Sequence, residues 1–110
     1  MLFISGTASV DNHGRSLYRG DFLAQTKRTF DNITALLNSE DAKWSDVVQT
    51  RCYIKNMRYY TKFNVFRTGF YRRQGLVFFP ASVCVEAQLC RPELLIEIEA
   101  VAILRTQKKI

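Results

Sequence analysis

Residues 79–100 of this chain read FPASVCVEAQLCRPELLIEIEA, a pattern that predicts two β-strands joined by a short connection. In the second strand, Glu97 and Glu99 alternate with aliphatic residues and therefore project from one face. The first strand also separates its residues by face, with polar Ser82, Cys84, Glu86 and Gln88 on one side and Val83, Val85 and Ala87 on the other. Both strands therefore present a face that carries groups capable of chemistry.

The first third of the chain predicts a hairpin followed by a helix. A strand over residues 2–10 and a short return strand over residues 16–19 would flank a turn at residues 11–14. Asp21 has the position of a helix N-cap, and residues 22–37 carry apolar side chains at helical spacing. We therefore expect a helix over residues 22–37 that is buried along one face.

A strand and a second helix are predicted in the middle of the chain. Residues 47–54 are rich in β-branched and aromatic side chains, which favours a strand. Aromatic residues then recur every three or four positions from residue 59 to residue 70, and Gly75 ends this helix. Such an aromatic stripe is typical of a buried helix face. On the outer faces of the helix we expect Arg67, Arg72 and Arg73.

The resulting order of elements, β-β-α-β-α-β-β, is an α+β arrangement in a single domain over residues 1–110. Two helices can cover only one face of the sheet, yet the strand at residues 47–54 has apolar side chains on both of its faces. The second face of the sheet therefore needs a partner. We expect further copies of the same chain to supply it, in a homo-oligomer.

The composition is ordinary for a globular domain, with 47% hydrophobic and 24% charged residues. No apolar run approaches the roughly 20 residues that cross a bilayer, and no signal-peptide pattern is present, so we expect a cytoplasmic protein without a membrane partner. The cysteines Cys52, Cys84 and Cys90 lack CxxC spacing, and His13 is the only histidine. Neither a disulfide framework nor a metal site is indicated, and no cofactor is expected.

The net charge of +6 and the pI near 9.5 raise the question of nucleic-acid binding. The basic pairs are Lys27-Arg28, Arg72-Arg73 and Lys108-Lys109, and they are distributed over separate elements instead of forming one stripe. No RNA-recognition motif with stacking aromatic residues is visible. A solvated basic surface, or an attraction for small anions, is therefore favoured over nucleic acid as a partner.

Motifs along nearly the whole chain resemble those of the RidA/YjgF family, which is also called the L-PSP endoribonuclease family and includes enamine and imine deaminases. The similarity includes Ile4-Ser5-Gly6-Thr7, Gln25-Thr26, Asp31-Asn32-Ile33, Asp46-Val47-Val48-Gln49-Thr50, and an ungapped match from Pro80 to Glu99. The resemblance implies a homotrimer whose sheets pack around a central barrel, with ligand sites in the clefts between subunits. It also keeps an RNA-associated role open as an alternative.

The resemblance to the deaminases also identifies candidate site residues. In these enzymes an arginine follows the Pro-Ala pair and holds the carboxylate of the substrate while water attacks an imine. Here Ser82 takes that position, and a hydroxyl cannot replace a guanidinium fork. Cys84 and Glu97 match family positions that line the cleft, where Glu97 orients the attacking water. The resemblance thus implies a pocket for a small carboxylate metabolite without the usual deaminase arginine.

A local resemblance to the C-terminal domain of chorismatases implies a different reaction. It covers Ser5-Gly6-Thr7-Ala8-Ser9 and Cys90-Arg91-Pro92-Glu93-Leu94-Leu95-Ile96-Glu97-Ile98-Glu99. Glu97 would then be a general acid that protonates an enolpyruvyl ether. Cys90 would influence the product and Arg91 would hold a carboxylate, so Ser5, Gly6, Cys90 and Arg91 join the candidate substrate-binding residues. The alternatives are a salt-bridge set of Glu97, Glu99 and Arg91, and a non-catalytic ligand-binding protein.

The start of the chain departs from the family pattern. Relatives usually carry an additional strand before the segment that corresponds to residues 2–6, and this chain begins directly at that segment. The chain is then either a short variant or the C-terminal part of a longer protein. The second alternative is favoured, because a missing edge strand leaves unpaired backbone at the margin of the sheet.

Overall fold

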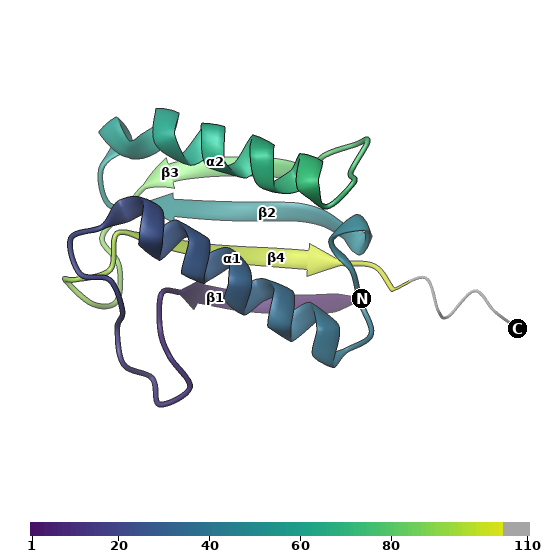
Figure 1. Ribbon diagram of the computed structural model, residues 1–110, viewed down its shortest axis with the longest axis horizontal. Coiled ribbons are helices and arrows are strands. Elements are labelled where there is room, and N and C mark those ends of the chain that lie inside the picture. The colour runs from purple at the N-terminus through teal and green to yellow at the C-terminus, as the bar shows by residue number, and fades with distance from the viewer. Residues whose placement is uncertain (105–110) are drawn as a thin grey trace, which may run out of the picture.

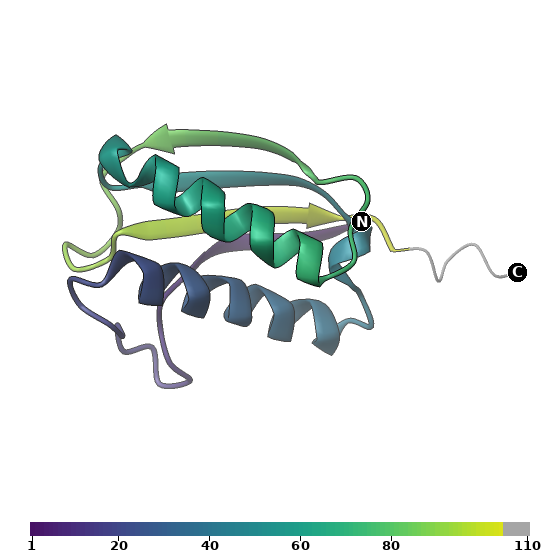
Figure 2. The same ribbon diagram turned by 45° about the horizontal axis from the view of Figure 1, so that its top comes forward.

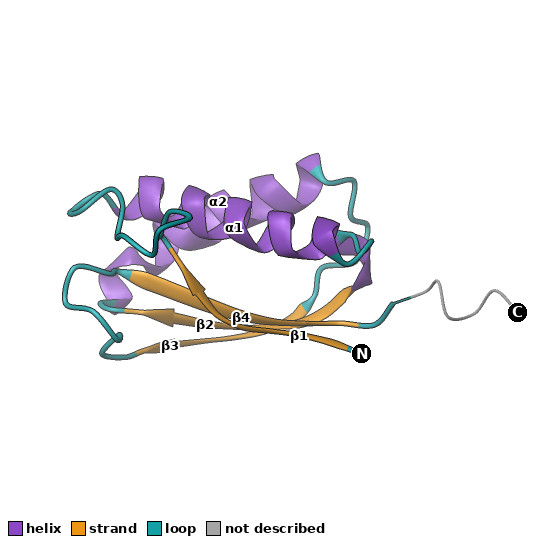
Figure 3. Ribbon diagram, turned by 90° about the horizontal axis from the view of Figure 1, so that it is seen from below, coloured by secondary structure: helices purple, strands orange, loops and turns teal. Residues whose placement is uncertain are grey.

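One four-stranded sheet with two α-helices on one face makes up the structure, a computed structural model that describes residues 1–104 (Figures 1 and 3). The strands are β1 (Leu2–Ala8), β2 (Val47–Ile54), β3 (Ala81–Glu86) and β4 (Ile96–Ala102). The helices are α1 (Phe22–Ser39) and α2 (Tyr60–Arg73), and the 3₁₀ turns η1 (Trp44–Asp46) and η2 (Met57–Tyr59) precede β2 and α2. The predicted α+β arrangement is confirmed. Lys108 and Lys109 lie outside the described residues.

The strand order is β1-β4-β2-β3, so β1 and β3 form the two edges (Figure 1). β4 is antiparallel to both of its neighbours, whereas β2 and β3 are parallel. A parallel pair needs a crossover connection, and α2 supplies it. As a consequence β3 and β4, which follow each other in the sequence, are separated in the sheet by β2.

The predicted return strand over residues 16–19 is wrong. A single isolated bridge, between Val10 and Ser16, links the two sides of this turn. Further along, Tyr18 and Gly20 adopt left-handed conformations with φ values of 61° and 74°. An extended strand cannot contain such residues, so the chain turns toward α1 instead of pairing with β1.

Both helices form where they are predicted, and they lie side by side on the same face of the sheet (Figures 2 and 3). α1 begins at Asp21, whose carboxylate accepts a hydrogen bond of 3.0 Å from the backbone N–H of Ala24. α2 ends at Arg73, close to Gly75 with its φ of 78°. Neither helix in the described part of the chain is long and apolar enough to cross a membrane.

The core lies between the helices and the sheet, and Phe30 of α1 is at its centre. Its ring centroid is 4.8 Å from that of Phe70, and further aromatic contacts surround it. These partners are Trp44, Phe63, Phe66 and Tyr71. The aromatic stripe of α2 is therefore core. From the sheet, the buried side chains of Cys52, Ile54, Ile96, Ile98, Ala100 and Ala102 complete it.

The opposite face of the sheet is not covered by any element of residues 1–104 (Figure 3). Residues paired in register on neighbouring strands share a face, which places Tyr53 beside Glu97, and Arg51 beside Glu99, on this open face. Apolar side chains also lie exposed on the outer strands, with Phe3 at 72% and Val83 at 52% exposure. A face of this kind is unusual for a protein that remains a monomer.

Candidate functional site

An open groove of about 790 Å³ runs along the free edge of β1. The C-terminal half of α1 and the segment that leads into β4 form its other walls. Most of the candidate site residues line this groove, namely Ser5, Gly6, Cys90, Arg91 and Glu97. Residues from the two ends of the sequence are thus brought together because β1 pairs with β4.

Gly6 and Glu97 are in direct contact within the groove. The register between β1 and β4 shifts between Ile4 and Thr7, as in a β-bulge, and this shift brings Gly6 under the Glu97 side chain. A Cβ atom at position 6 would overlap the Glu97 carboxylate and would lie 2.9 Å from its Cδ. Only glycine therefore leaves room for the carboxylate where it lies.

The two glutamates of β4 differ in their partners. The hydroxyl of Tyr53 donates a hydrogen bond of 2.8 Å to Glu99 Oε1. This bond, with smaller effects of burial and of the Glu99 charge, raises the pKa of Tyr53. Glu97 is half-buried and has no hydrogen-bond or ion-pair partner within residues 1–104. Of the two glutamates, only Glu99 therefore has a partner within residues 1–104.

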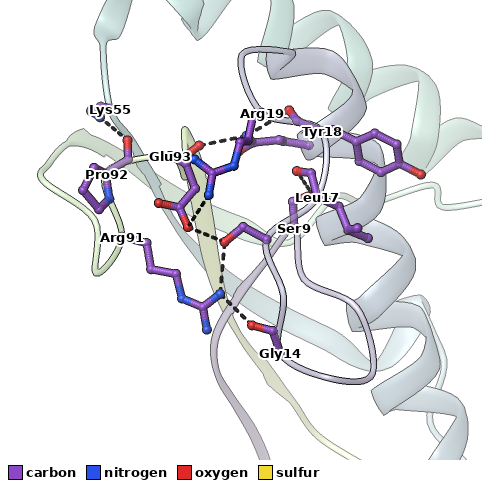
Figure 4. Close-up of polar contacts among 11 residues, drawn as sticks. Ser9, Gly14, Leu17, Tyr18, Arg19, Lys55, Arg91, Pro92 and Glu93 are labelled. Atoms are coloured by element: carbon purple, nitrogen blue, oxygen red, sulfur yellow. Dashed lines mark hydrogen bonds and ion pairs between the residues drawn. The ribbon is translucent and has the colours of Figure 1, made fainter.

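Arg91 connects the turn at residues 14–16 to the segment before β4 (Figure 4). Its Nη1 donates to the carbonyl oxygen of Gly14 at 2.7 Å and to Ser16 Oγ at 3.0 Å. Ser16 Oγ in turn donates to Glu93 Oε2 at 2.6 Å, and Arg19 lies 4.0 Å from the same oxygen. The hydrogen bond from Ser16, and to a smaller extent the charges of Arg19 and Arg91, lower the pKa of Glu93.

These contacts give Arg91 a structural function, because they hold residues 14–16 against the segment before β4. The predicted salt-bridge set of Glu97, Glu99 and Arg91 does not form within residues 1–104, since no ion pair joins these residues there.

Ser82 and Cys84 lie elsewhere, on the face of the sheet that carries the helices. Ser82 is paired in register with Thr50, and Cys84 with Cys52, and both of these β2 residues are buried under the helices. Glu97 projects from the other face, since its partner in β2 is Tyr53. Ser82 and Cys84 are therefore not brought together with Glu97 within residues 1–104 of one chain, and the expectation that they line a cleft between subunits stays a prediction.

Arg67 of α2 contacts Ser82, a residue pair that the sequence did not reveal. Its Nη1 donates to Ser82 Oγ at 2.9 Å, and its Nη2 donates to Asn64 Oδ1 at 2.8 Å. The guanidinium carbon also lies 4.8 Å from the ring centroid of Phe63. The expectation that Arg67 faces outward is wrong, because α2 crosses above β3 and directs this side chain toward the strand.

The Arg67 charge is close to a group of thiols and hydroxyls. Burial raises the pKa of Cys52 to about 11 and raises that of the half-buried Cys84, and in both cases the charge of Arg67 opposes the rise. Within residues 1–104, the hydroxyls of Thr50 and Tyr71 are buried without a hydrogen-bond partner. Residues 1–104 contain no group of three or more histidine, cysteine or acidic residues that could hold a metal ion.

The two basic pairs within residues 1–104, Lys27-Arg28 and Arg72-Arg73, lie on separate helices. Lys27 forms an ion pair of 3.0 Å with Asp31, and Arg28 Nε donates to the carbonyl oxygen of Val10 at 3.3 Å. Arg72 and Arg73 lie in the last turn of α2, where positive charge favours the helix dipole. Local partners thus account for several of the charges that raise the pI.

Comparisons with known proteins identify one family. A family model described as Endoribonuclease L-PSP matches residues 1–104. A RutC family protein of Pyrococcus abyssi is 32% identical over 101 residues, which cover 92% of this chain and 76% of that protein. The chain therefore spans about three quarters of that relative.

Solved structures show the same similarity. The crystal structure of the YjgF gene product of E. coli has a TM-score of 0.82 and 28% identity, and the match covers 94% of this chain and 80% of that one. The structure of YyfB from Yersinia pestis, described as a protein of unknown function of the conserved Rid family, has a TM-score of 0.82 and 33% identity. That match covers 94% of this chain and 77% of the other.

Proposed function

This chain belongs to the Endoribonuclease L-PSP family, the family of the YjgF and Rid proteins, and on that basis we propose that it binds or transforms a small carboxylate metabolite in clefts between the subunits of a homotrimer. The observation that carries the proposal is the half-buried Glu97 carboxylate, packed on Gly6 and without a partner in residues 1–104. A carboxylate that is partly withdrawn from water without a partner is costly. Such positions are typical of groups that meet a ligand.

The separation of the candidate residues supports a site between subunits. Glu97 lies on one face of the sheet, whereas Ser82 and Cys84 lie on the other face and at the opposite edge strand. A neighbouring copy whose edge strand β3 approaches the open face could bring its Ser82 and Cys84 toward the Glu97 of this subunit. The exposed Phe3 and Val83 side chains would be buried in the same contact.

The favoured reaction is hydrolysis of an imine or enamine. Water adds to the carbon of the C=N bond, and loss of ammonia then leaves the carbonyl product. Glu97 would orient the water by accepting a hydrogen bond from it. The ligand carboxylate requires a cation, which Ser82 cannot provide. Without one, the chain would bind its ligand weakly and function as a poor deaminase or as a carrier.

A second candidate is cleavage of an enolpyruvyl ether. It is favoured by one observation, that Cys90, Arg91 and Glu97 line the same groove as Ser5 and Gly6. The Glu97 carboxyl group would protonate the methylene carbon, water would add to the resulting cation, and the hemiketal would collapse to pyruvate and an alcohol. This candidate takes second place because Gly14 and Ser16 already engage the guanidinium of Arg91.

The experiment is a calorimetric titration of the purified chain with pyruvate, 2-oxobutyrate, chorismate and 4-hydroxybenzoate, combined with assays for ammonia and pyruvate release. Glu97→Gln is the test variant and Glu99→Gln is the matched control, since both glutamates lie on the same face of β4 but Tyr53 already engages Glu99. We expect Glu97→Gln to abolish turnover and Glu99→Gln to retain most of it.

Each result separates the alternatives. Release of ammonia from an imino acid supports the deaminase reaction, and release of pyruvate from chorismate supports the second candidate. Binding without turnover identifies a ligand-binding protein. If none of these acids binds, and RNA binds instead with an affinity that falls steeply with salt, the proposal is wrong.

A further inference from the structure

We propose that Arg67 binds the carboxylate of the ligand, in place of the arginine that the family pattern has at the position of Ser82. This inference rests on the proposed function, because it assigns the cation of the same site. The missing guanidinium would then be supplied by helix α2 instead of strand β3, and at nearly the same place, since Arg67 touches Ser82 itself.

The contacts of Arg67 fix its guanidinium in one orientation. Two of its nitrogens donate to neutral oxygens, Ser82 Oγ at 2.9 Å and Asn64 Oδ1 at 2.8 Å. Phe63, one turn earlier in α2, supports the group from one side with its ring centroid at 4.8 Å. A guanidinium that is held in place before binding loses little side-chain entropy when a ligand arrives.

The charge of Arg67 is not neutralised within residues 1–104, where it makes no ion pair. The side chain is half-buried, while Asn64 and Ser82 beside it are exposed. A guanidinium carries five N–H donors in a fork that matches a carboxylate, and the two bonds to neutral oxygens leave the others available. An anion that approaches from the exposed side could therefore accept hydrogen bonds from the remaining N–H groups of Arg67.

A serine at position 82 is consistent with a carboxylate-binding role of Arg67. Serine is short enough to leave space for the guanidinium of Arg67, and its hydroxyl accepts one of the N–H groups. The guanidinium of an arginine at position 82 would compete with that of Arg67 for the same space, and two like charges would be in contact. Ser82 and Arg67 thus form a pair in which helix α2, instead of strand β3, carries the cation.

The surroundings indicate a small, partly apolar acid. Cys84 follows Ser82 on the same face of β3 and is half-buried, so the ligand would contact a neutral thiol next to the cation. Burial raises the pKa of Cys84 despite the opposing charge of Arg67, which favours the neutral form at pH 7. In the proposed trimer, Glu97 of a neighbouring copy would face the reacting end of the same ligand.

The test is a calorimetric titration with 2-oxobutyrate and with its uncharged amide. We expect Arg67→Gln to weaken binding of 2-oxobutyrate at least tenfold and to leave the weak binding of the amide unchanged. Arg67→Lys keeps the charge but loses the fork, and an intermediate loss is expected. Arg72→Gln, on the exposed side of the same helix, is the matched control and should bind like the wild type.

The double variant Arg67→Gln, Ser82→Arg returns the cation to the strand and should restore at least part of the lost affinity. Thermal unfolding of each variant separates effects on binding from effects on folding. If Arg67 were merely structural, Arg67→Gln would lower the unfolding temperature without a selective loss of affinity for 2-oxobutyrate over its amide. If the wild type binds 2-oxobutyrate and Arg67→Gln binds it equally well, this inference is wrong while the proposed function stands. If the wild type binds no carboxylate at all, both are wrong.

Discussion

At the scale of the residue, position 6 must be a glycine for the Glu97 carboxylate to lie where it does. A Cβ atom at this position would overlap the end of the Glu97 side chain, which is flexible enough to move away. We therefore expect Gly6→Ala to cost less than about 1 kcal/mol of unfolding free energy but to abolish ligand binding, because the carboxylate is displaced. Chemical denaturation and calorimetric titration measure the two effects.

The matched control is Gly69→Ala, which lies in α2 and whose added Cβ would be 3.3 Å from the movable Arg73 guanidinium. Alanine favours a helix over glycine by roughly 0.5–1 kcal/mol, so this variant should be slightly more stable and should bind normally. Equal binding by both variants would show that the position of Glu97 does not matter.

Glu93 makes the stability depend on pH. The hydrogen bond from Ser16, the largest cause, holds the pKa of Glu93 below its ordinary value in the folded state. A lowered folded pKa contributes stability that is present above the ordinary carboxyl range and is lost as the pH falls through the folded pKa. Between neutral pH and about pH 3, the wild type should therefore lose more stability than Glu93→Gln.

Urea denaturation at a series of pH values measures this difference. Glu40→Gln, which removes an exposed carboxylate at the end of α1, is the control variant. Parallel curves for Glu93→Gln and the wild type would contradict the assignment.

At the scale of the element, α1 is connected to two loops through the fully buried Gln25. Its Nε2 donates to the carbonyl oxygens of Tyr18 at 3.2 Å and Glu93 at 3.0 Å, and its Oε1 accepts from the N–H of Leu95 at 2.8 Å. In Gln25→Leu these buried backbone groups would lose their partner, and we expect a loss of about 2–4 kcal/mol in unfolding free energy.

The comparison for this variant is Gln74→Leu, which changes an exposed glutamine at the end of α2 and should cost less than about 0.5 kcal/mol. Because Gln25 holds the loops beside Arg91, heteronuclear NMR should also show larger shifts around Arg91 in Gln25→Leu. Two variants of equal stability would mean that water replaces the lost bonds.

At the scale of the whole molecule, the open face of the sheet is the proposed subunit contact. Val83 lies on this face with 52% exposure and is paired in register with Arg51. In the proposed trimer, a lysine at position 83 would be buried in the contact beside that arginine, and we expect Val83→Lys to be monomeric. Sedimentation velocity measures the change.

Val65 provides the control, because it is 70% exposed on α2 and lies away from the open face. Val65→Lys should therefore remain trimeric. If the wild type sediments as a monomer at every concentration, the site between subunits would have to be abandoned.

Local patterns were sufficient for most of the helices and strands of this protein and for part of its candidate site. The period of two in β4, the helical spacing after Asp21 and the aromatic stripe of α2 each depend on residues a few positions apart, and all three predictions are confirmed. The family motifs identified Glu97 and Gly6 as residues to examine. The return strand at residues 16–19 was predicted wrongly, because Tyr18 and Gly20 adopt left-handed conformations that end the extended segment.

Relations between distant segments required the tertiary structure. β2 lies between β3 and β4, and the register of its two pairings places Ser82 and Glu97 on opposite faces of the sheet, although their strands follow each other in the sequence. The contact of Arg67 with Ser82 depends on how α2 crosses β3. Periodicity shows which side of an element is apolar, but strand order and helix crossing are set by packing over the whole chain, and these decide which functional groups meet.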